Sequence, residues 1–389
     1  MKRILSFGSL VDPGELAHIP EASEAANRFQ LGLLSGLKER GVEDVVALTG
    51  FPIATVPRPR RLLVEGHRWE SDGLRIVAPG FLNVPPIKPL WIHAALRRAG
   101  LAERQGVEAV LSYNPAPGFG SAALSVARTL GVPFICVVAD HTMRRQRSPL
   151  RALEWKWSTR VIKSSDGLVV LSGHVVGDLA TTVPWVKVDG GLSDDWDVLP
   201  QVDALTKTIV YAGTPSFAGG AQLLLDAFSL VDDPEMRLVF AGRGGLMDEV
   251  QAAAAVDPRI AIEGFLPRDE MQGLLASATV LVNPRLSDEE ENRFNFPSKI
   301  LDYLASARPV VTTLAGDLDP VYGDIGIPLI DETPAALARL LQDTCARSEE
   351  ELRDIGARGR RFVLAERRWA AQSELVYRLI CRVLEGGTS

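Results

Sequence analysis

The sequence has few of the residues that cross-link small secreted proteins or bind metals. Among 389 residues there are 3 cysteines and 5 histidines. Cys136, Cys345 and Cys381 are too far apart to form a C-x-x-C pair, so neither a disulfide framework nor a zinc site is predicted. The scarcity of cysteine fits a reducing compartment, and we expect a cytoplasmic protein.

Long apolar runs and an excess of positive charge are also missing. No run approaches the roughly 20 apolar residues that a membrane-spanning helix needs, and residues 1–8 hold too few apolar residues for a signal peptide. Lys and Arg total 42 against 49 Asp and Glu, which gives a net charge of −7. The molecule as a whole does not attract nucleic acid, and no nucleic-acid partner is predicted.

What the sequence does have is length and an ordinary globular composition. Apolar residues make up 46% and charged residues 23% of a chain long enough for two domains with separate cores. Short β-branched runs alternate with longer helical stretches, a pattern that predicts parallel sheets with helices on both faces. The expected strands are 3–7, 44–48, 108–113, 133–139, 167–171, 207–212, 236–241, 279–283 and 309–313. The expected helices are 22–40, 119–130, 150–163, 219–230, 245–255, 269–277 and 297–306, with late helical sequence continuing to about residue 385.

A segment without helical periodicity separates the two series. It contains Pro184, the pair Gly190-Gly191 and Pro200, which is typical of a linker. We expect an N-terminal domain over 1–186, a linker over 187–207, a C-terminal domain over 208–365, and a helix over 366–389 that returns to the N-terminal domain. The predicted fold class is α/β, with two Rossmann-like domains facing a cleft. Such sheets bind ligands where loops leave the carboxyl ends of strands.

The most informative stretch is NRFNFPSKILDYLASARPVV, residues 292–311. A strand ends at Asn283, and Pro297 is well placed as the first residue of the next helix. The free amides and positive dipole end of that helix, with the Ser298 hydroxyl and the Lys299 ammonium, offer what a phosphate or diphosphate needs. The alternative is that Lys299 is merely solvated and Ser298 merely caps the helix.

Two further strand ends carry glycine turns. In LVFAGRGG, residues 238–245, Gly242 permits close backbone approach and Arg243 is able to clamp phosphate oxygens. In YAGTP, residues 211–215, Gly213 and Thr214 occupy a similar position facing the same cleft. Taken alone, such a turn is as often only a tight connection.

Five motifs in order along residues 211–311 carry a resemblance to a known family. They are YAG with a following GG-x₃-LL helix, FAGRG, GFLP, LVNP and FPSK. Together they resemble the donor-binding domain of retaining GT-B glycosyltransferases of glycosyltransferase family 4, particularly bacterial members with the FPSK helix start. The resemblance implies two Rossmann-like domains, with a nucleotide-sugar donor held mainly by the C-terminal one and the acceptor mainly by the N-terminal one.

The resemblance also implies a set of site residues. The expected donor-binding residues are Gly190, Gly213, Thr214, Gly242, Arg243, Arg285, Asn295, Pro297, Ser298, Lys299 and Asp302. The expected catalytic residues are His141, Lys299 and Arg243, and the expected acceptor-binding residues are Glu24, Asn27 and Asp140. Neither a metal nor a permanently bound cofactor is expected, and the nucleotide base of the donor is open.

The chain departs from the family pattern where the diphosphate is usually held. The Arg and Lys that commonly follow the first strand of the donor domain fall on Thr214 and Gly219. The positive charge that a diphosphate needs must therefore come from elsewhere, and Arg243, Arg285 and Lys299 are the candidates.

A second departure concerns the paired glutamates of the family, which align with Phe294 and Asp302. The second carboxylate is kept in shortened form, and we expect Asp302 to hold the ribose. The first is missing, which leaves Glu291 or Asn292 to read the donor sugar, unless the acidic run 288–291 is only a solvated loop.

His141 ends a strand on the cleft side, where the family often has an active-site histidine. It either hydrogen-bonds the donor or a developing charge, or simply caps the strand end, and both interpretations stay open.

Residues 144–163 hold seven basic residues against Glu154 alone, a net charge of +6, with Trp155 and Trp157 among them. A membrane-surface helix and a plain solvated helix are the two interpretations.

Three other functions compete. A G-x-G-x-x-A match at 118–123 with Asp140 about 20 residues later suggests a nicotinamide-dependent oxidoreductase, but residues 114–117 separate the strand from the first glycine. Asp-x-Asp pairs at 195–197 and 317–319 suggest a metal-dependent transferase and lie in loops. A non-catalytic two-lobed binding protein is the third.

We expect transfer of a hexose-type sugar to a hydroxyl acceptor with retained configuration, in surface polysaccharide or glycolipid synthesis. A glycosyltransferase for a small secondary metabolite is the alternative.

Overall fold

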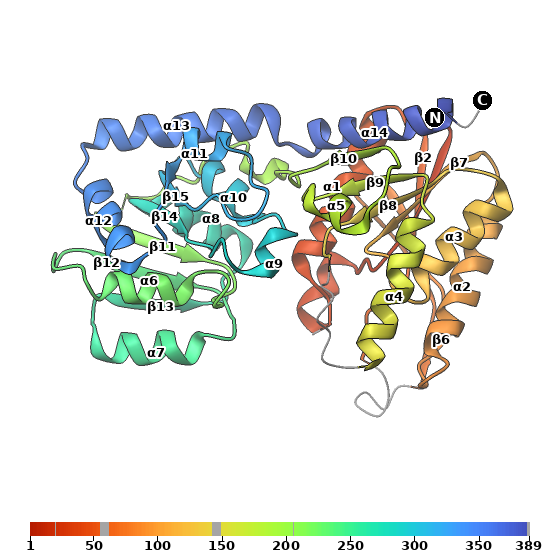
Figure 1. Ribbon diagram of the computed structural model, residues 1–389, viewed down its shortest axis with the longest axis horizontal. Coiled ribbons are helices and arrows are strands. Elements are labelled where there is room, and N and C mark those ends of the chain that lie inside the picture. The colour runs from red at the N-terminus through yellow and green to blue at the C-terminus, as the bar shows by residue number, and fades with distance from the viewer. Residues whose placement is uncertain (20, 55–61, 142–148, 205, 387–389) are drawn as a thin grey trace. The chain divides into compact units, whose positions relative to one another are not determined.

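The computed structural model describes residues 1–19, 21–54, 62–141, 149–204 and 206–386 (Figure 1). The chain forms two compact units. The N-terminal unit comprises Met1–Gly191 and Trp369–Ser389, and the C-terminal unit comprises Leu192–Arg368. The segment 187–207, expected as a linker, is thus divided between the two units.

A mostly parallel eight-stranded sheet forms the middle of the N-terminal unit, in the order β10-β9-β8-β7-β1-β2-β5-β4. The strands are β1 (Arg3–Gly8), β2 (Asp44–Thr49), β4 (His67–Ser71), β5 (Leu74–Ala78), β7 (Val107–Tyr113), β8 (Phe134–Val138), β9 (Gly167–Val170) and β10 (Trp185–Lys187). In this sheet β4 pairs antiparallel with β5, at one edge. β3 (Leu63–Val64) pairs antiparallel with β6 (Phe81–Leu82) in a separate two-stranded sheet. The central strands are apolar and almost fully buried, as expected for a parallel sheet covered on both faces.

Helices cover both faces of this sheet (Figure 1). On one face, α1 (Glu24–Glu39) packs along α14 (Trp369–Gly386), the helix at the end of the chain. A Cβ on Gly36 would overlap Ser373 and the Trp369 backbone, so glycine is required for this close approach. On the other face lie α2 (Lys88–Ala102), α3 (Phe119–Leu130) and α4 (Pro149–Lys163). A short 3-10 helix, η1 (Pro13–His18), precedes α1, and α5 (His174–Leu179) follows β9.

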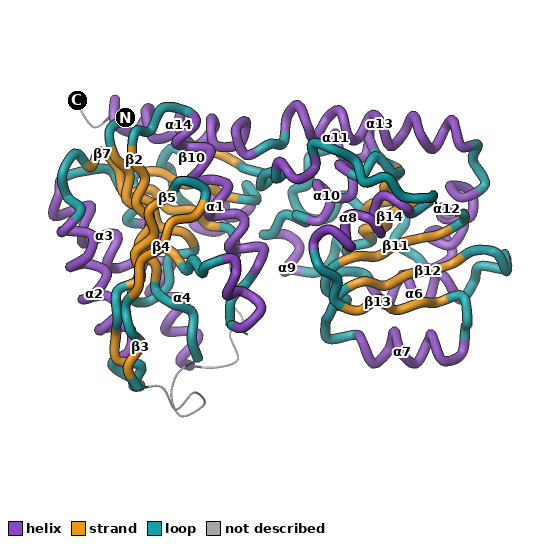
Figure 2. The backbone as a smooth tube through the Cα atoms, turned by 180° about the vertical axis from the view of Figure 1, so that it is seen from behind, coloured by secondary structure: helices purple, strands orange, loops and turns teal. Residues whose placement is uncertain are grey.

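The C-terminal unit has a wholly parallel six-stranded sheet in the order β13-β12-β11-β14-β15-β16, which Figure 2 shows as orange tubes between purple helices. The strands are β11 (Thr208–Ala212), β12 (Arg237–Ala241), β13 (Ile260–Gly264), β14 (Val280–Asn283), β15 (Val310–Thr312) and β16 (Ile327–Pro328). The helices are η2 (Asp194–Trp196), α6 (Ala221–Phe228), α7 (Met247–Val256), α8 (Arg268–Ser277), α9 (Glu290–Arg293), α10 (Lys299–Ala305), α11 (Val321–Ile325), α12 (Pro334–Cys345) and α13 (Glu349–Glu366). The apolar side chains of α6 and α12 form one core with alternate residues of the strands.

The predicted strands and helices are confirmed, with their ends shifted by at most two residues. The pattern missed several elements, among them α2, β13 and the β4–β5 pair. α2 buries only Ile92, Leu96 and Gly100, and β4 and β13 are edge strands in which few residues are buried. β5, in contrast, alternates buried and half-buried residues, and the pattern missed it as well. One shift affects the site. The helix expected from Pro297 begins instead at Lys299, because residues 297–300 form a turn in which the Pro297 carbonyl accepts from Ile300.

Candidate functional site

Three neighbouring strands of the C-terminal unit end in glycines with left-handed backbone. Gly213, Gly242 and Gly264 follow or end β11, β12 and β13, with φ of 119°, 137° and 66°. The Gly213 N–H donates to the Ala241 carbonyl, and a Cβ on Gly242 would overlap the Gly213 carbonyl oxygen. Backbone packing requires glycine at Gly242, and the positive φ favours it at Gly213 and Gly264. The resulting loops present main-chain groups at the carboxyl edge of the sheet.

Lys299 lies beside this edge at the start of α10. Its ammonium nitrogen stands 3.8 Å from the centre of the Tyr211 ring, and its stem passes under Gly213. Tyr211 is held by a hydrogen bond from its hydroxyl to the Thr214 carbonyl, at 3.0 Å. Lys299 is half-buried, whereas Tyr211 is fully buried. Burial, and then repulsion by Arg285, lower the pKa of Lys299 to about 7.

Arg285 follows β14 and supplies the second cation of this edge. Its guanidinium donates to the side-chain oxygen of Asn292, which is itself buried and donates to the carbonyls of Ala218 and Leu286. Burial lowers the pKa of Arg285, an effect that Glu291 partly offsets. Among the residues that the structure describes, neither Lys299 nor Arg285 is ion-paired with a carboxylate.

The remaining donor candidates of the C-terminal unit lie along the same edge. Arg243 is exposed on the loop after β12, with its guanidinium 4.9 Å from the ring centre of Phe265 on the next loop. Thr214 and Ser298 are exposed, and the side chain of Ser298 makes no capping hydrogen bond. Pro297 is buried and Asn295 half-buried, with its side-chain oxygen covered.

Asp302 lies one turn into α10 and is engaged by the protein itself. Its Oδ1 accepts hydrogen bonds from the indole N–H of Trp196 at 2.7 Å and from Arg268 at 2.9 Å. Trp196 is fully buried, and Arg268 also pairs with Asp195. The carboxylate thus ties residues 194–197 to α10, and the ribose contact expected of Asp302 stays a prediction.

Both carboxylates of the Asp-x-Asp pair at 195–197 form ion pairs with arginines. Asp195 pairs with Arg268, and Asp197 pairs with Arg368. These carboxylates neutralise arginines of their own unit. In the described part of the chain, no three His, Cys, Asp or Glu side chains gather in a way that could hold a metal ion.

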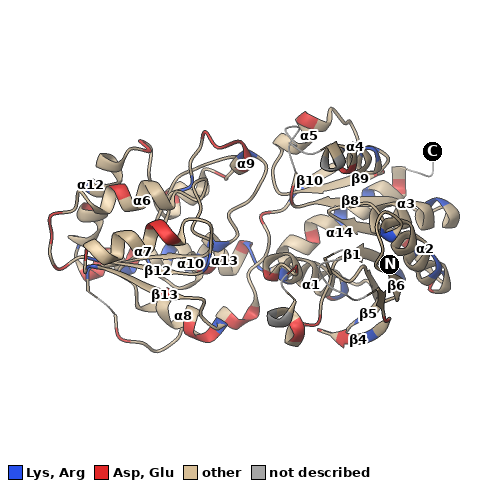
Figure 3. Ribbon diagram, turned by 90° about the horizontal axis from the view of Figure 1, so that it is seen from below, with Lys and Arg blue, Asp and Glu red and all other residues tan. Residues whose placement is uncertain are grey.

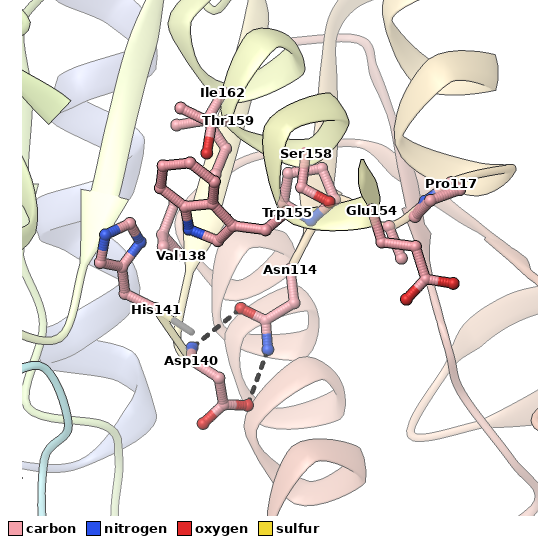
Figure 4. Close-up of a pocket in the computed structure, with 12 residues that line it drawn as sticks. Asn114, Pro117, Val138, Asp140, His141, Glu154, Trp155, Ser158, Thr159 and Ile162 are labelled. Carbon is pink, nitrogen blue, oxygen red and sulfur yellow. Dashed lines mark hydrogen bonds between the residues drawn. The ribbon is translucent and has the colours of Figure 1, made fainter. Parts of the chain in front are cut away.

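The N-terminal unit holds the other predicted residues. His141 is buried, and its Nε2 lies 2.8 Å from a carboxylate oxygen of Asp178 on α5. The preceding Asp140 accepts a hydrogen bond from the amide of Asn114 at 2.9 Å. Both His141 and Asp140 line a pocket at the carboxyl ends of β7 and β8 (Figure 4).

The other expected residues of this unit differ in accessibility. Glu24 is exposed at the first turn of α1. Asn27 is buried, and its amide bonds both the N–H and the carbonyl of Val11, so it holds the loop after β1. Gly190 is buried near the end of the segment Met1–Gly191, and its backbone has φ of 80°. Arg144, Arg145 and Arg147 of the basic segment lie outside the described residues.

The sequence pattern missed Asn114 and Trp155, which help to form the pocket, and Trp196, which bonds Asp302. Asn114 has a left-handed backbone with φ of 40°, and its side-chain oxygen accepts the N–H groups of Ala139 and Asp140. The sequence signal for this conformation is an asparagine directly after a strand, because asparagine adopts a left-handed backbone more readily than most residues. No local signal identifies Trp155 or Trp196, because their partners are distant in sequence.

The C-terminal unit matches a known family. Residues 206–346 match the family model described as "Glycosyl transferases group 1". The comparison with curated proteins finds no match.

Solved structures match the chain over the length of both units. HepE from Anabaena, in complex with UDP, shares 12% identity at a TM-score of 0.69, covering 98% of this chain and 100% of HepE. Sucrose-phosphate synthase from Thermosynechococcus elongatus shares 15% sequence identity at a TM-score of 0.69, and the match covers 99% of this chain and 100% of the synthase. WaaG, a glycosyltransferase involved in lipopolysaccharide biosynthesis, shares 14% sequence identity at a TM-score of 0.65, and the match covers 97% of this chain and 99% of WaaG. These likenesses confirm the predicted GT-B fold with its two parallel-sheet units.

Proposed function

We propose, from the glycosyl transferases group 1 match in the C-terminal unit, that this protein is a retaining glycosyltransferase that moves a hexose from a nucleotide diphosphate sugar to a hydroxyl acceptor. The family match and the fold support a glycosyltransferase with a nucleotide-sugar donor. HepE has been seen with UDP and with UDP and glucose, which supports a donor of this type. The involvement of WaaG in lipopolysaccharide biosynthesis favours a surface polysaccharide or glycolipid product.

The observation that carries the proposal is the pair of cations at the carboxyl edge of the six-stranded sheet. Lys299 and Arg285 are both partly buried, and each has its pKa lowered by burial. Holding two cations there without a paired carboxylate costs free energy, which a bound dianion would recover. A diphosphate between the loop at Gly213 and the start of α10 has the matching charge.

The same charges stabilise the leaving group. As the bond from the sugar to the diphosphate breaks, negative charge grows on the departing phosphate, and Lys299 and Arg285 oppose it. Retention through a double displacement would need a carboxylate nucleophile, and the motif carboxylate Asp302 is already bonded to Trp196 and Arg268. We therefore propose same-face attack: the acceptor oxygen bonds to the anomeric carbon, and its proton passes to the leaving phosphate oxygen. No metal takes part in this scheme.

Titration of the purified protein with UDP, GDP and dTDP tests the donor site. Saturable binding of one nucleotide well above the others is the expected result. A protein that binds none of the three, or binds NAD instead, would contradict the proposal.

We also propose that the protein acts in the cytoplasm and touches an anionic membrane through the basic segment 144–163. On α4, Leu153, Lys156 and Arg160 are exposed and share one face at helical spacing. Figure 3 marks basic residues on this helix. Among the described helices, none is both long and apolar enough to cross a membrane.

A further inference from the structure

A pocket in the N-terminal unit suggests which acceptor the enzyme uses. It has a volume of about 360 Å³ and lies between the loops after β7 and β8 and the side of α4 that faces the sheet. This volume falls within the roughly 300–1,000 Å³ of small-molecule sites. Figure 4 shows side chains from all three segments converging on it.

Its floor is a fixed pair of polar groups. The Asn114 amide donates to one carboxylate oxygen of Asp140 at 2.9 Å, and its own oxygen accepts the Asp140 N–H at 3.0 Å. These bonds hold the carboxylate in place and leave further acceptor capacity on it. Desolvation raises the pKa of Asp140 above its usual value, so hydrogen-bond donors in the pocket would be attracted to it.

One wall is aromatic. Figure 4 shows the indole of Trp155 between His141 and Ser158, above Asn114 and Asp140. Its N–H is covered and has no hydrogen-bond partner within the part of the chain that the structure describes, so the indole offers the pocket its apolar face. A flat apolar surface suits the C–H face of a pyranose ring, whose hydroxyls then point to polar groups around it.

Among the described lining residues, the carboxylates of two acidic side chains set the charge. Asp140 and Glu154 carry carboxylates, while His141 is paired with Asp178, and none of the twelve described lining residues is Lys or Arg. A phosphate group would meet like charge here, whereas sugar hydroxyls would find acceptors.

We infer that this pocket binds the acceptor as an uncharged pyranose without phosphate, with its hydroxyls on Asp140 and its ring on Trp155. The inference rests on the proposed function, because it assigns the acceptor of that transfer. It also places the acceptor beside His141, the expected catalytic histidine.

Binding to the full-length protein without donor tests the inference. We would follow a panel of methyl pyranosides, and the 6-phosphates of the same sugars, by saturation-transfer NMR and titration. At least one methyl pyranoside should bind saturably and its 6-phosphate at least about tenfold more weakly. Asp140→Asn and Trp155→Ala should each weaken binding about tenfold, because the first loses a charged acceptor and the second the aromatic face. Asp232→Asn and Trp185→Ala, changes of the same kind outside the pocket, should not.

The outcomes separate this inference from the proposed function. If the nucleotides bind and no methyl pyranoside does, the pocket inference is wrong and the donor site stands. If the 6-phosphates bind better, the pocket is a phosphate site and the inference is wrong. If a pyranoside binds with the expected variant effects and no nucleotide binds, the pocket stands and the proposed transfer falls. Melting temperatures of the variants exclude unfolding as the cause of lost binding.

Discussion

At the residue scale, the chemistry of the donor site depends on Lys299. Its sequence position suggested a solvated lysine or a phosphate ligand, and the structure places its ammonium against the Tyr211 ring with Arg285 nearby. A lysine held in this way loses hydration and forms no ion pair with a carboxylate of the described residues, so its charge is available to an anionic ligand.

Replacing Lys299 should therefore slow the reaction strongly. Lys299→Ala is expected to lower turnover with the preferred nucleotide sugar by about 10²-fold or more, because the leaving diphosphate loses a cation. Steady-state kinetics with the purified protein would measure this. Lys207→Ala is the matched control. Lys207 lies directly before β11, at the end of the strand away from Gly213, and its ammonium pairs with Asp233 and Glu235. A near-normal turnover in Lys299→Ala would reject the role.

The lowered pKa of Lys299 gives the donor site a pH dependence. With a pKa of about 7 in the free protein, the cation is present below pH 7 and lost above it. Affinity for a nucleotide sugar should fall by about tenfold between pH 6 and pH 8. Titration calorimetry across this range measures the effect. In Lys299→Arg the slope should flatten, because arginine stays charged; an unchanged slope would assign the titration to another group.

At the element scale, short helices and turns owe their positions to distant partners. α10 has only seven residues, and Asp302 in it is tied to the η2 segment by Trp196 and Arg268. On the other unit, α14 lies along α1 through glycines that admit no side chain. The sequence indicated both helices, but their spacing to the neighbours depends on single residues.

Trp196→Phe tests the tie between η2 and α10. Phenylalanine keeps most of the buried ring and removes the N–H that Asp302 accepts, so the free energy of unfolding should fall by about 1–3 kcal/mol. Chemical denaturation would measure the loss. If Trp196→Phe is as stable as the parent, the bond contributes nothing. Trp185→Phe, at an exposed tryptophan, should change stability by no more than about 0.5 kcal/mol.

Gly36→Val tests the packing of α14 on α1. The added side chain would overlap Ser373 and the backbone of Trp369, and the expected cost is about 1–3 kcal/mol, with α14 cut earlier by a protease. Gly177→Ala on α5 is the control, since a Cβ there meets nothing within 4 Å. Equal thermal stability of the two variants would argue against the proposed packing.

At the scale of the whole molecule, the chain leaves the N-terminal unit after Gly191 and returns to it at Trp369. The donor candidates other than Gly190 gather in one unit, whereas His141, Asp140, Glu24 and Asn27 belong to the other. The net charge of −7 contrasts with the basic segment 144–163, and this contrast motivates the membrane contact.

That contact predicts binding to vesicles. At low salt the protein should sediment with vesicles rich in anionic lipid and remain in solution with neutral ones, and the bound fraction should fall as salt rises. Lys156→Glu with Arg160→Glu should reduce binding. Equal recovery in the supernatant with both kinds of vesicle would remove the membrane contact.

The sequence by itself determined the α/β class, nearly every central strand and the glycine turns at the strand ends, because these follow from local apolar periodicity and from backbone conformations that only glycine adopts freely. Only the tertiary structure decided that Lys299 sits on Tyr211, that Asp302 bonds Trp196, that Asn27 is buried, and that Trp155 and Asn114 form a pocket with Asp140. Each of these contacts joins residues far apart along the chain, and burial or charge compensation at such a distance leaves no periodic signal in the sequence.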